Sequence, residues 1–274
     1  MQDLGVIGGG SDSMALLIND VAQVAGVSFT SSTPNPNNGP ACIPDVPTQD
    51  PFLWEQQGKG MTDLGSLGGD CGWPYALNNQ GEVAGDSTAP GDAYRLPFLW
   101  TKGTGMQALP TTPSGSLGGE AFGINDAGQV VGYAQNSAEA FALLWEKGKA
   151  RRLGNLTGAD CTIAYSINSG GQVVGFSGPG ARGCTGRAVL WEKDGPPVDL
   201  NLLVPPNAPL HMSEAISIND LGEIIGSGAV HDSDIHGFMA IPCDENHPGI
   251  EGCDYSLVGA RAIPTNPAPV RQRS

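Results

Sequence analysis

Basic side chains are scarce in this sequence. Lys and Arg together number 13, against 28 Asp and Glu, and the formal net charge is −15. A surface of that sign repels phosphate backbones and anionic headgroups, which argues against nucleic acid and acidic membranes as partners. The partners left are an extracellular glycan or a protein surface, and we expect the chain to act as a monomer.

Long apolar runs are also absent. No stretch of 18 apolar residues occurs, so we expect no membrane insertion. No signal peptide is visible at the N-terminus. Met1–Gly5 instead copies Met61–Gly65, a segment inside a later repeat. We therefore expect that a leader was removed from a longer, secreted precursor.

What the sequence does contain is a repeated unit. The core Ile-Asn-Asp-Ala-Gly-Gln-Val-Val-Gly occurs in five versions: Ile18–Gly26, Leu77–Gly85, Ile124–Gly132, Ile167–Gly175 and Ile218–Gly226. An apolar segment ending in Trp follows the first four cores, at Trp54, Trp100, Trp145 and Trp191. A short segment ending in Leu follows each Trp. Every unit thus offers four short strands, here called A, B, C and D in chain order.

The residue pattern of strands A and B supports a hairpin. Residues before each Asn alternate between large and small, which is the period of a β-strand. The Asn-x-x-Gly that follows is a turn sequence, because Asn bonds its own backbone and Gly accepts a positive φ. A Gly such as Gly85 recurs inside strand B and predicts close approach of another backbone. The Trp residues are expected to be buried between neighbouring repeats.

Four-stranded repeats of ~46 residues predict an all-β, five-bladed β-propeller. The blades span about 14–64, 73–109, 120–153, 162–200 and 213–257. Strand 1–5 is expected to complete the last blade and close the ring, with Asp254–Leu257 as a competing candidate. One domain would then cover 1–258, followed by a Pro-rich disordered tail at 259–274.

Several of these motifs resemble the extracellular HAF-repeat family. They are Asp63-Leu64-Gly65-Ser66-Leu67-Gly68-Gly69, the Asn78 and Asn125 cores, Pro97-Phe98-Leu99-Trp100 and His236-Gly237-Phe238. The resemblance covers nearly the whole chain up to about Val258. It implies a secreted bacterial protein of mostly unassigned function, and it supplies no catalytic residues to carry over.

The six cysteines are even in number and contain no Cys-x-x-Cys, which favours disulfides over a zinc site. In a propeller blade the A–B and C–D turns share one face, and the B–C and D–A loops share the other. Cysteines on the same face near one another can pair. We expect Cys42–Cys71, Cys161–Cys184 and Cys243–Cys253.

The two faces are predicted to differ. The A–B turns are tight, whereas every long segment is a B–C or D–A loop, so we call that side the long-loop face. Functional residues concentrate on loops held by a rigid scaffold. Candidate ligand-binding residues there are Trp73, Tyr94, Arg95, Asp92 and Arg182. The alternative for these carboxylate-rich loops is solvated turn residues without a ligand.

His231-Asp232-Ser233-Asp234-Ile235-His236 is the densest run of metal-ligating residues. Asp232, Asp234 and His231 could hold a cation, for which calcium is favoured by the hard carboxylate oxygens. A rival arrangement would use the imidazoles of His211, His231 and His236 for a transition metal. The alternative to a metal site is a solvated loop that binds no ion.

We interpret the chain as a secreted binding or extracellular-matrix interaction module, glycan-binding through its long-loop face. No catalytic motif stands out, and we lean against an enzyme. The alternative is a glycoside hydrolase or lyase that uses a pair of carboxylates on the same face. Its candidates are Asp70, Asp86, Asp160 and Asp232.

Overall fold

A computed structural model describes residues 1–36, 38–43, 45–56, 60–111, 117–180, 184–193, 195–205, 208–230, 234–250 and 253, and the backbone of 270–273. The chain divides into two compact units. The first comprises Met1–Ser137 and Leu143–Arg151, and the second comprises Ala138–Ala142 and Arg152–Ser274. The described residues form strands and one short 3-10 helix. None of their helices has the length and apolar character needed to cross a membrane.

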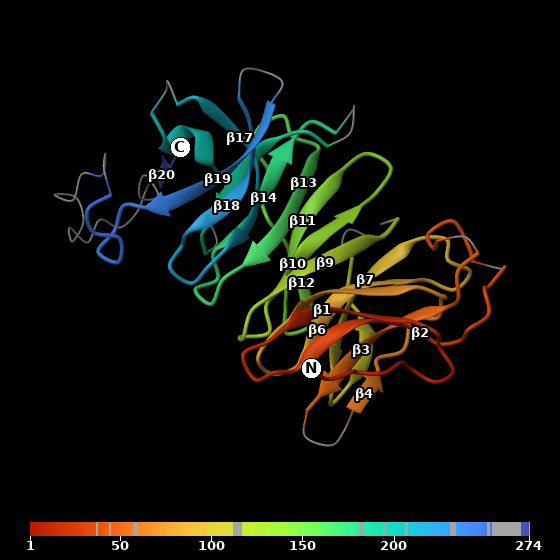
Figure 1. Cartoon of the computed structure of the whole chain (residues 1–274). Helices are drawn as coiled ribbons and strands as arrows, with labels where there is room; N and C mark the ends of the chain where they lie inside the picture. The colour runs from red at the N-terminus through yellow and green to blue at the C-terminus, as the bar shows by residue number, and fades with distance from the viewer. Residues whose placement is uncertain are drawn as a thin grey trace. The chain divides into compact units, whose positions relative to one another are not determined.

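The first unit consists of antiparallel sheets whose strands follow the order of the chain (Figure 1). One sheet contains β1 (Ser13–Ile18), β2 (Val24–Phe29), β3 (Gln49–Glu55) and β4 (Gly60–Asp63). The next contains β5 (Gly72–Leu77), β6 (Val83–Thr88), β7 (Arg95–Thr101) and β8 (Gly105–Ala108). Then come β9 (Gly119–Ile124), β10 (Val130–Gln135), β11 (Ala140–Glu146) and β12 (Lys149–Arg152). Strand β11 contributes residues to both units.

The second unit repeats the same order. It contains β13 (Cys161–Ile167), β14 (Val173–Gly178), β15 (Arg187–Trp191) and β16 (Val198–Asp199), followed by the 3-10 helix η1 (Leu200–Leu203). A further sheet contains β17 (Leu210–Ile218), β18 (Ile224–Val230), β19 (Asp234–Pro242) and β20 (Val270–Arg273). Ala140 of β11 also pairs in parallel with Cys161 of β13. The expected A, B, C and D strands are therefore present in succession along the chain.

The prediction for the last sheet was wrong in one respect. Its fourth strand is β20, which pairs antiparallel with β19 from Met239 to Pro242. Met1–Gly5 forms no strand, and Asp254–Leu257 lies outside the described residues. Part of the tail expected to be disordered thus supplies the strand. The tail reaches β19 through a much shorter loop than the N-terminus would, which lowers the entropy cost of pairing.

Each A–B turn is built on its Asn, as expected. The Oδ1 of Asn78 accepts the backbone N–H of Glu82 at 2.9 Å. The same side chain also reaches the next turn, because its Nδ2 donates to the carbonyl oxygen of Asn125 at 3.2 Å. In the second unit Asn168 donates to the carbonyl oxygen of Asn219 at 3.0 Å. The repeated Asn is therefore both a turn former and a link between consecutive hairpins.

Every A strand contains a β-bulge at the same position. At this position the pairing with strand B skips Leu16, Tyr75, Phe122, Tyr165 and Ile216, and the last copy also skips Ser213. The strand-B Gly lies beside this bulge, and a Cβ at Gly85 would come within 2.1 Å of the carbonyl oxygen of Trp73. The close backbone approach predicted from the recurring Gly is confirmed. A bulge re-aims its side chain out of the regular alternation, which matters for the site below.

The strand-C tryptophans are buried, as predicted. Trp145 and Trp191 are each 1% exposed. Their indole N–H groups donate to the carbonyl oxygens of Pro110 and Gly154, both at 2.8 Å. A buried indole needs such a partner, so these residues are structural and not ligand platforms.

Candidate functional site

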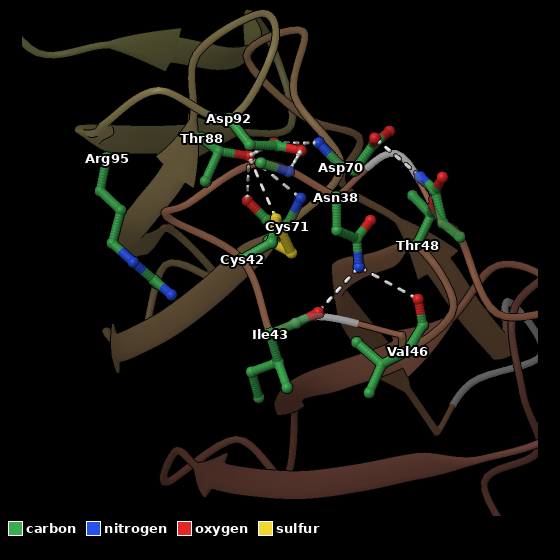
Figure 2. The surroundings of a disulfide bond; sticks show 12 residues. Asn38, Cys42, Ile43, Val46, Thr48, Asp70, Cys71, Thr88, Asp92 and Arg95 are labelled. Atoms are coloured by element: carbon green, nitrogen blue, oxygen red, sulfur yellow. Dashed lines mark hydrogen bonds between the residues drawn. A yellow bond between two sulfur atoms is a disulfide. The ribbon is translucent and has the colours of Figure 1, made fainter.

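The long loop between β2 and β3 is held in place by covalent and polar contacts (Figure 2). Cys42 in this loop forms a disulfide with Cys71, which directly precedes β5. Asn35 donates from Nδ2 to the Asp70 carboxylate at 2.8 Å. Asn38 closes the loop tip by donating to the carbonyl oxygens of Ile43 and Val46 at 2.9 and 3.1 Å. The loop is therefore fastened to the start of the next sheet.

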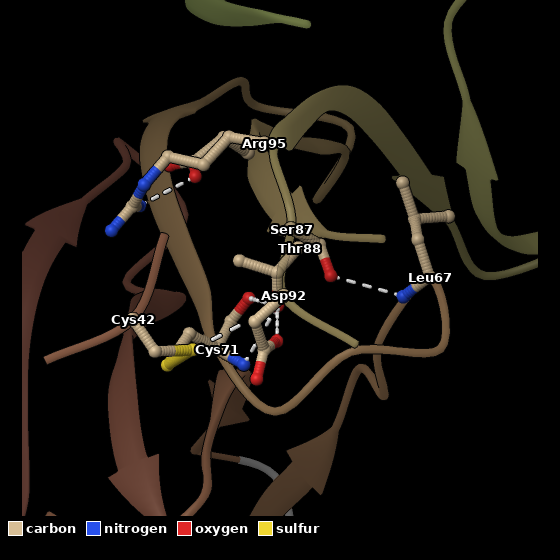
Figure 3. A network of polar contacts seen from close by, with 8 residues as sticks. Cys42, Leu67, Cys71, Ser87, Thr88, Asp92 and Arg95 are labelled. Carbon is tan, nitrogen blue, oxygen red and sulfur yellow. Dashed lines mark hydrogen bonds and ion pairs between the residues drawn. A yellow bond between two sulfur atoms is a disulfide. The ribbon is translucent and has the colours of Figure 1, made fainter. Parts of the chain in front are cut away.

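Asp92 organises the neighbouring loop between β6 and β7 (Figure 3). Its carboxylate accepts hydrogen bonds from the Thr88 hydroxyl at 2.5 Å and from the backbone N–H groups of Asp70 and Gly39 at 2.8 and 3.1 Å. Burial alone would raise the pKa of Asp92, but these hydrogen bonds outweigh it and lower the pKa. Asp92 is 1% exposed. We predicted it as a ligand-binding residue, and the structure instead shows a buried anchor for three loops.

The D–A loops are anchored by a recurrent serine of strand B. Ser87 accepts the backbone N–H of Leu67 at 2.9 Å, as Figure 3 shows. Ser177 accepts that of Leu156 at 2.9 Å in the second unit. Ser28 accepts that of Ile7 at 3.0 Å. Loops fixed in this way carry side chains at defined positions, so less entropy is lost when they bind a ligand.

A buried carboxylate lies close to these anchored loops. Asp86 of β6 has no exposed side-chain surface and forms an ion pair with Arg95 of β7, with 2.6 Å between Nη1 and Oδ2. Its other oxygen, Oδ1, has no hydrogen-bond partner in the described protein. Burial raises the pKa of Asp86, and Arg95 and the Tyr75 hydroxyl only partly oppose the rise. Such an orphan oxygen calls for a water molecule or a ligand group.

Aromatic rings and a second carboxylate accompany Asp86. Tyr75 and Phe122 make an edge contact with 5.1 Å between ring centroids, and Phe122 stacks on Tyr133 at 5.8 Å. Glu120 stands opposite Tyr133 in the β9–β10 pairing. Burial, followed by the charge of Asp86, raises the pKa of Glu120, although Arg95 and a hydrogen bond with Tyr133 oppose it. Apart from Asp86, these side chains are partly exposed. We call Tyr75, Asp86, Arg95, Glu120, Phe122 and Tyr133 the acid–aromatic cluster.

The cluster has the chemistry of a polar-ligand site. Burial, followed by the negative charges nearby, raises the pKa of both Tyr75 and Tyr133, so both phenols remain protonated donors. Carboxylates supply acceptors, and Arg95 supplies planar donors. Aromatic faces beside convergent polar groups are typical of small-molecule sites.

A third acid, Asp50, lies in β3, directly after the β2–β3 loop. Burial, followed by the charges of Asp63 and Asp70, raises its pKa to about 6. Its Oδ1 atom is buried without a partner in the described protein. Both charges that act on it are acidic, so nothing comparable to Arg95 compensates Asp50.

The carboxylates predicted for an enzyme do not form a pair with one another among the described residues. Asp70 accepts from Asn35 in the first unit, and Asp160 accepts from the backbone N–H of Gly180 in the second. Only Asp86 belongs to the acid–aromatic cluster, and its charge acts on Glu120, which we did not predict. Asp232 lies outside the described residues.

The other predicted binding residues are dispersed. Arg95 joins the cluster, Trp73 pairs across the strands with Asp86, and Tyr94 is 44% exposed on the β6–β7 loop. Arg182, His231 and Asp232 lie outside the described residues. Asp234 is exposed at the start of β19. Within the part of the chain that is described, no group of three or more His, Cys, Asp or Glu could hold a metal ion.

Comparison of the five copies would have revealed the residues that were missed. One cross-strand pair beside each bulge varies in character: Met14–Val27, Trp73–Asp86, Glu120–Tyr133, Ile163–Phe176 and Glu214–Ser227. The first and fourth pairs are apolar. A charged side chain at a position that other copies fill with an apolar one is the signal that points to Asp86 and Glu120.

The three disulfides have the expected partners, Cys42–Cys71, Cys161–Cys184 and Cys243–Cys253. Their Cα–Cα distances are 5.8, 5.6 and 5.4 Å, all within the usual range. Disulfides persist in oxidising compartments, so the protein has the features of one that folds in such an environment.

No protein-family model matches the chain, and no curated protein matches its sequence. Solved structures do resemble it. TolB from Acinetobacter baumannii matches with a TM-score of 0.50 at 12% identity, over 83% of this chain and 51% of TolB. An acylaminoacyl peptidase from Pyrococcus horikoshii matches with a TM-score of 0.45 at 10% identity, over 82% and 37%. The chain therefore spans about half or less of these two proteins.

The β-propeller domain of the trilobed protease from Pyrococcus furiosus matches with a TM-score of 0.36 at 9% identity, over 84% of this chain and 81% of that domain. Identities this low bear on the fold alone. The likeness to TolB places the chain among all-β proteins of the propeller-like class.

Proposed function

We propose that this protein is a secreted five-bladed propeller of the HAF-repeat type that binds a glycan through the long-loop end of its strands. The five A–B–C–D strand sets and the resemblance of their motifs support the class. The three disulfides support an extracellular setting.

One observation carries the binding proposal: Oδ1 of Asp86 is buried without a described partner, in a cluster whose other side chains are partly exposed. Sugar rings present hydroxyls for carboxylates and guanidinium groups, and apolar faces for aromatic rings. The acid–aromatic cluster offers both, on strands β5 to β7 of one sheet and strands β9 and β10 of the next. Its neighbouring loops are fixed by Cys42–Cys71 and by Asp92, which makes the site preorganised.

The test is a glycan array with the full chain, followed by titration of the glycans retained. We expect Asp86→Asn and Tyr133→Phe each to weaken binding of a neutral oligosaccharide at least about tenfold, because each removes a polar group of the cluster. Lys149→Ala, on the exposed strand β12, serves as the control and should bind normally. Absence of any retained glycan, or full affinity in both cluster variants, would refute the proposal.

An enzyme is the second candidate, favoured by the electrostatic coupling of Asp86 and Glu120. Glycoside hydrolysis uses two carboxyl groups, one of them with a raised pKa. Glu120, partly exposed and with a raised pKa, would serve as the acid. Incubation of the retained polysaccharides with wild-type protein separates the two functions. Chain cleavage that disappears in Glu120→Gln supports the enzyme, whereas binding without cleavage supports the module.

A further inference from the structure

The second unit contains a cleft of its own, distant in sequence from the acid–aromatic cluster. Its volume is about 290 Å³. It is lined by the D–A loop Thr157–Ala159, by Pro179 after β14, by Thr185 and Arg187 at the start of β15, and by His211 of β17. These are B–C and D–A segments, so the cleft opens at the long-loop end of its strands. Ligand sites begin at about 300 Å³, so the cleft suits one sugar-sized group.

Every polar side chain of the lining can donate a hydrogen bond, and Arg187 can only donate. Arg187 and His211 supply nitrogen atoms, Thr157 and Thr185 supply hydroxyls, and no Asp or Glu is among the described lining residues. The contrast with the acid–aromatic cluster is chemical, because that cluster contains two carboxylates. A donor-rich cleft selects a ligand group that accepts hydrogen bonds, and a carboxylate accepts them most strongly.

The Arg187 guanidinium is held in a fixed orientation. Its Nη1 lies 2.7 Å from Oδ2 of Asp199, whose side chain is 3% exposed. The other oxygen of Asp199 accepts from the backbone N–H and the side-chain amide of Asn201 at 3.0 and 2.9 Å. Asp199 is therefore anchored on both sides. Arg187 remains 45% exposed, so the rest of its planar fork is open to a ligand in the cleft.

A disulfide joins the two walls of the cleft. Cys161 follows the Thr157–Ala159 loop after one residue, and Cys184 directly precedes Thr185. Their bond therefore fixes the D–A loop relative to the start of β15. Asp160, between the loop and Cys161, is turned to the backbone N–H of Gly180. The loop and Arg187 are thus held in place, and the carboxylates of Asp160 and Asp199 both have partners.

We propose that this cleft binds the carboxylate of an acidic sugar residue, a uronate, within a glycan. The inference rests on the proposed glycan-binding function and adds a second, charge-selective subsite to it. Arg187 binds the carboxylate through two parallel N–H groups, and His211 and Thr185 contact the same residue of the sugar. Because Asp199 balances the charge of Arg187, recognition depends on directed hydrogen bonds more than on net attraction.

The test is calorimetry of the full chain with trigalacturonate, with its methyl ester, and with a sulfated oligosaccharide of equal length. We expect trigalacturonate to bind at least about tenfold more tightly than the ester, because the ester lacks the charged acceptor. Arg187→Lys retains a cation for Asp199 but loses the fork, and it should lose about tenfold in affinity for the acid. His211→Gln, at an exposed position, should lose a few-fold and guards against misfolding of the Arg187 variant.

Arg152→Gln is the matched control, because Arg152 belongs to the same unit but pairs with Glu139. It should bind trigalacturonate like the wild type. Equal affinity for acid and ester, unchanged affinity in both Arg187→Lys and His211→Gln, or tighter binding of the sulfated ligand would overturn the uronate site. Neutral-glycan binding that depends on Asp86 would then still stand. If no glycan of any kind binds, the proposed function fails together with this subsite.

Discussion

Two buried aspartates, one in each unit, pair with arginine in the same way but are supported differently. Asp86 and Asp199 have 0% and 3% exposed side chains, and lie 2.6 and 2.7 Å from Arg95 and Arg187. Asp199 also accepts two hydrogen bonds from Asn201, one of which caps η1. Asp86 has an oxygen without a described partner.

The two ion pairs differ in which member has its hydrogen-bonding capacity filled. A buried charge is costly unless its hydrogen-bonding capacity is filled. Asp199 meets that condition within its own unit, and its arginine is the half-exposed group that faces a cleft. Asp86 does not meet it, and aromatic rings and Glu120 stand beside it. In the first unit the acid has an oxygen without a described partner, whereas in the second unit the arginine is the member that remains exposed.

Removal of each arginine should have the largest and most unequal effect. Arg95→Met leaves Asp86 buried without a countercharge, and we expect a loss of about 3 kcal/mol in unfolding free energy at pH 7. Arg187→Met leaves Asp199 with its two Asn201 bonds, and we expect a loss of about 1 kcal/mol. Urea denaturation of both variants measures the difference.

The Arg95→Met effect should also depend on pH. The folded-state pKa of Asp86 is already raised, and loss of Arg95 raises it further, since Arg95 is the main opposing influence. Folding of the variant is therefore favoured below the unfolded pKa, and that stability disappears as the pH rises through the folded pKa. The deficit should shrink toward pH 4. A deficit independent of pH would contradict a charged, unsupported Asp86.

Replacement of each aspartate should reverse the ranking. Asp199→Asn turns an amide N–H₂ toward the Arg187 guanidinium, donor against donor, and should cost about 2 kcal/mol. Asp86→Asn faces the same conflict with Arg95 but removes a desolvated charge, so its stability should stay within about 1 kcal/mol of wild type. Thermal unfolding decides between them. Equal losses in the two variants would mean that Asp86 is a structural residue.

Much of this arrangement could be predicted from sequence. The five cores, the buried Trp residues and the disulfide partners follow from periodic patterns and from the faces that a blade creates. The fourth strand of the last sheet could not be predicted, because the sequence of β20 has no strand-D motif. Backbone pairing places little demand on side-chain identity, so motif similarity favoured the wrong segment, Met1–Gly5.

The site was predicted only in part, for a different reason. Asp86 and Arg95 were predicted as residues of the long-loop face. Their ion pair depends on the register of β6 and β7, which brings the two residues close together. Glu120 has no loop signal in the sequence, because it lies inside strand β9. Asp92 was misjudged because Asp in a Gly-rich turn looks solvated until the backbone N–H groups of Asp70 and Gly39 converge on it.

Asp50 provides the smallest and most selective test, because it is a partly exposed acid whose pKa is raised by burial and by acidic neighbours. Its pKa of about 6 lies above the ordinary aspartate value of 3.8. Its contribution to stability is thus fully present below about pH 4 and is lost as the pH rises through about 6.

Asp50→Asn should therefore be more stable than wild type at pH 8 and equal to it near pH 4. Because Asp50 is partly exposed, the gain should be about 1 kcal/mol, or roughly 2–4 °C in Tm. Thermal scans of both proteins from pH 4 to pH 8 measure it, with Asp45→Asn, an exposed acid of the preceding β2–β3 loop, as the control. If the two curves run parallel across that range, Asp50 is ionised without cost, and an unpartnered buried oxygen does not by itself mark a strained acid in this fold.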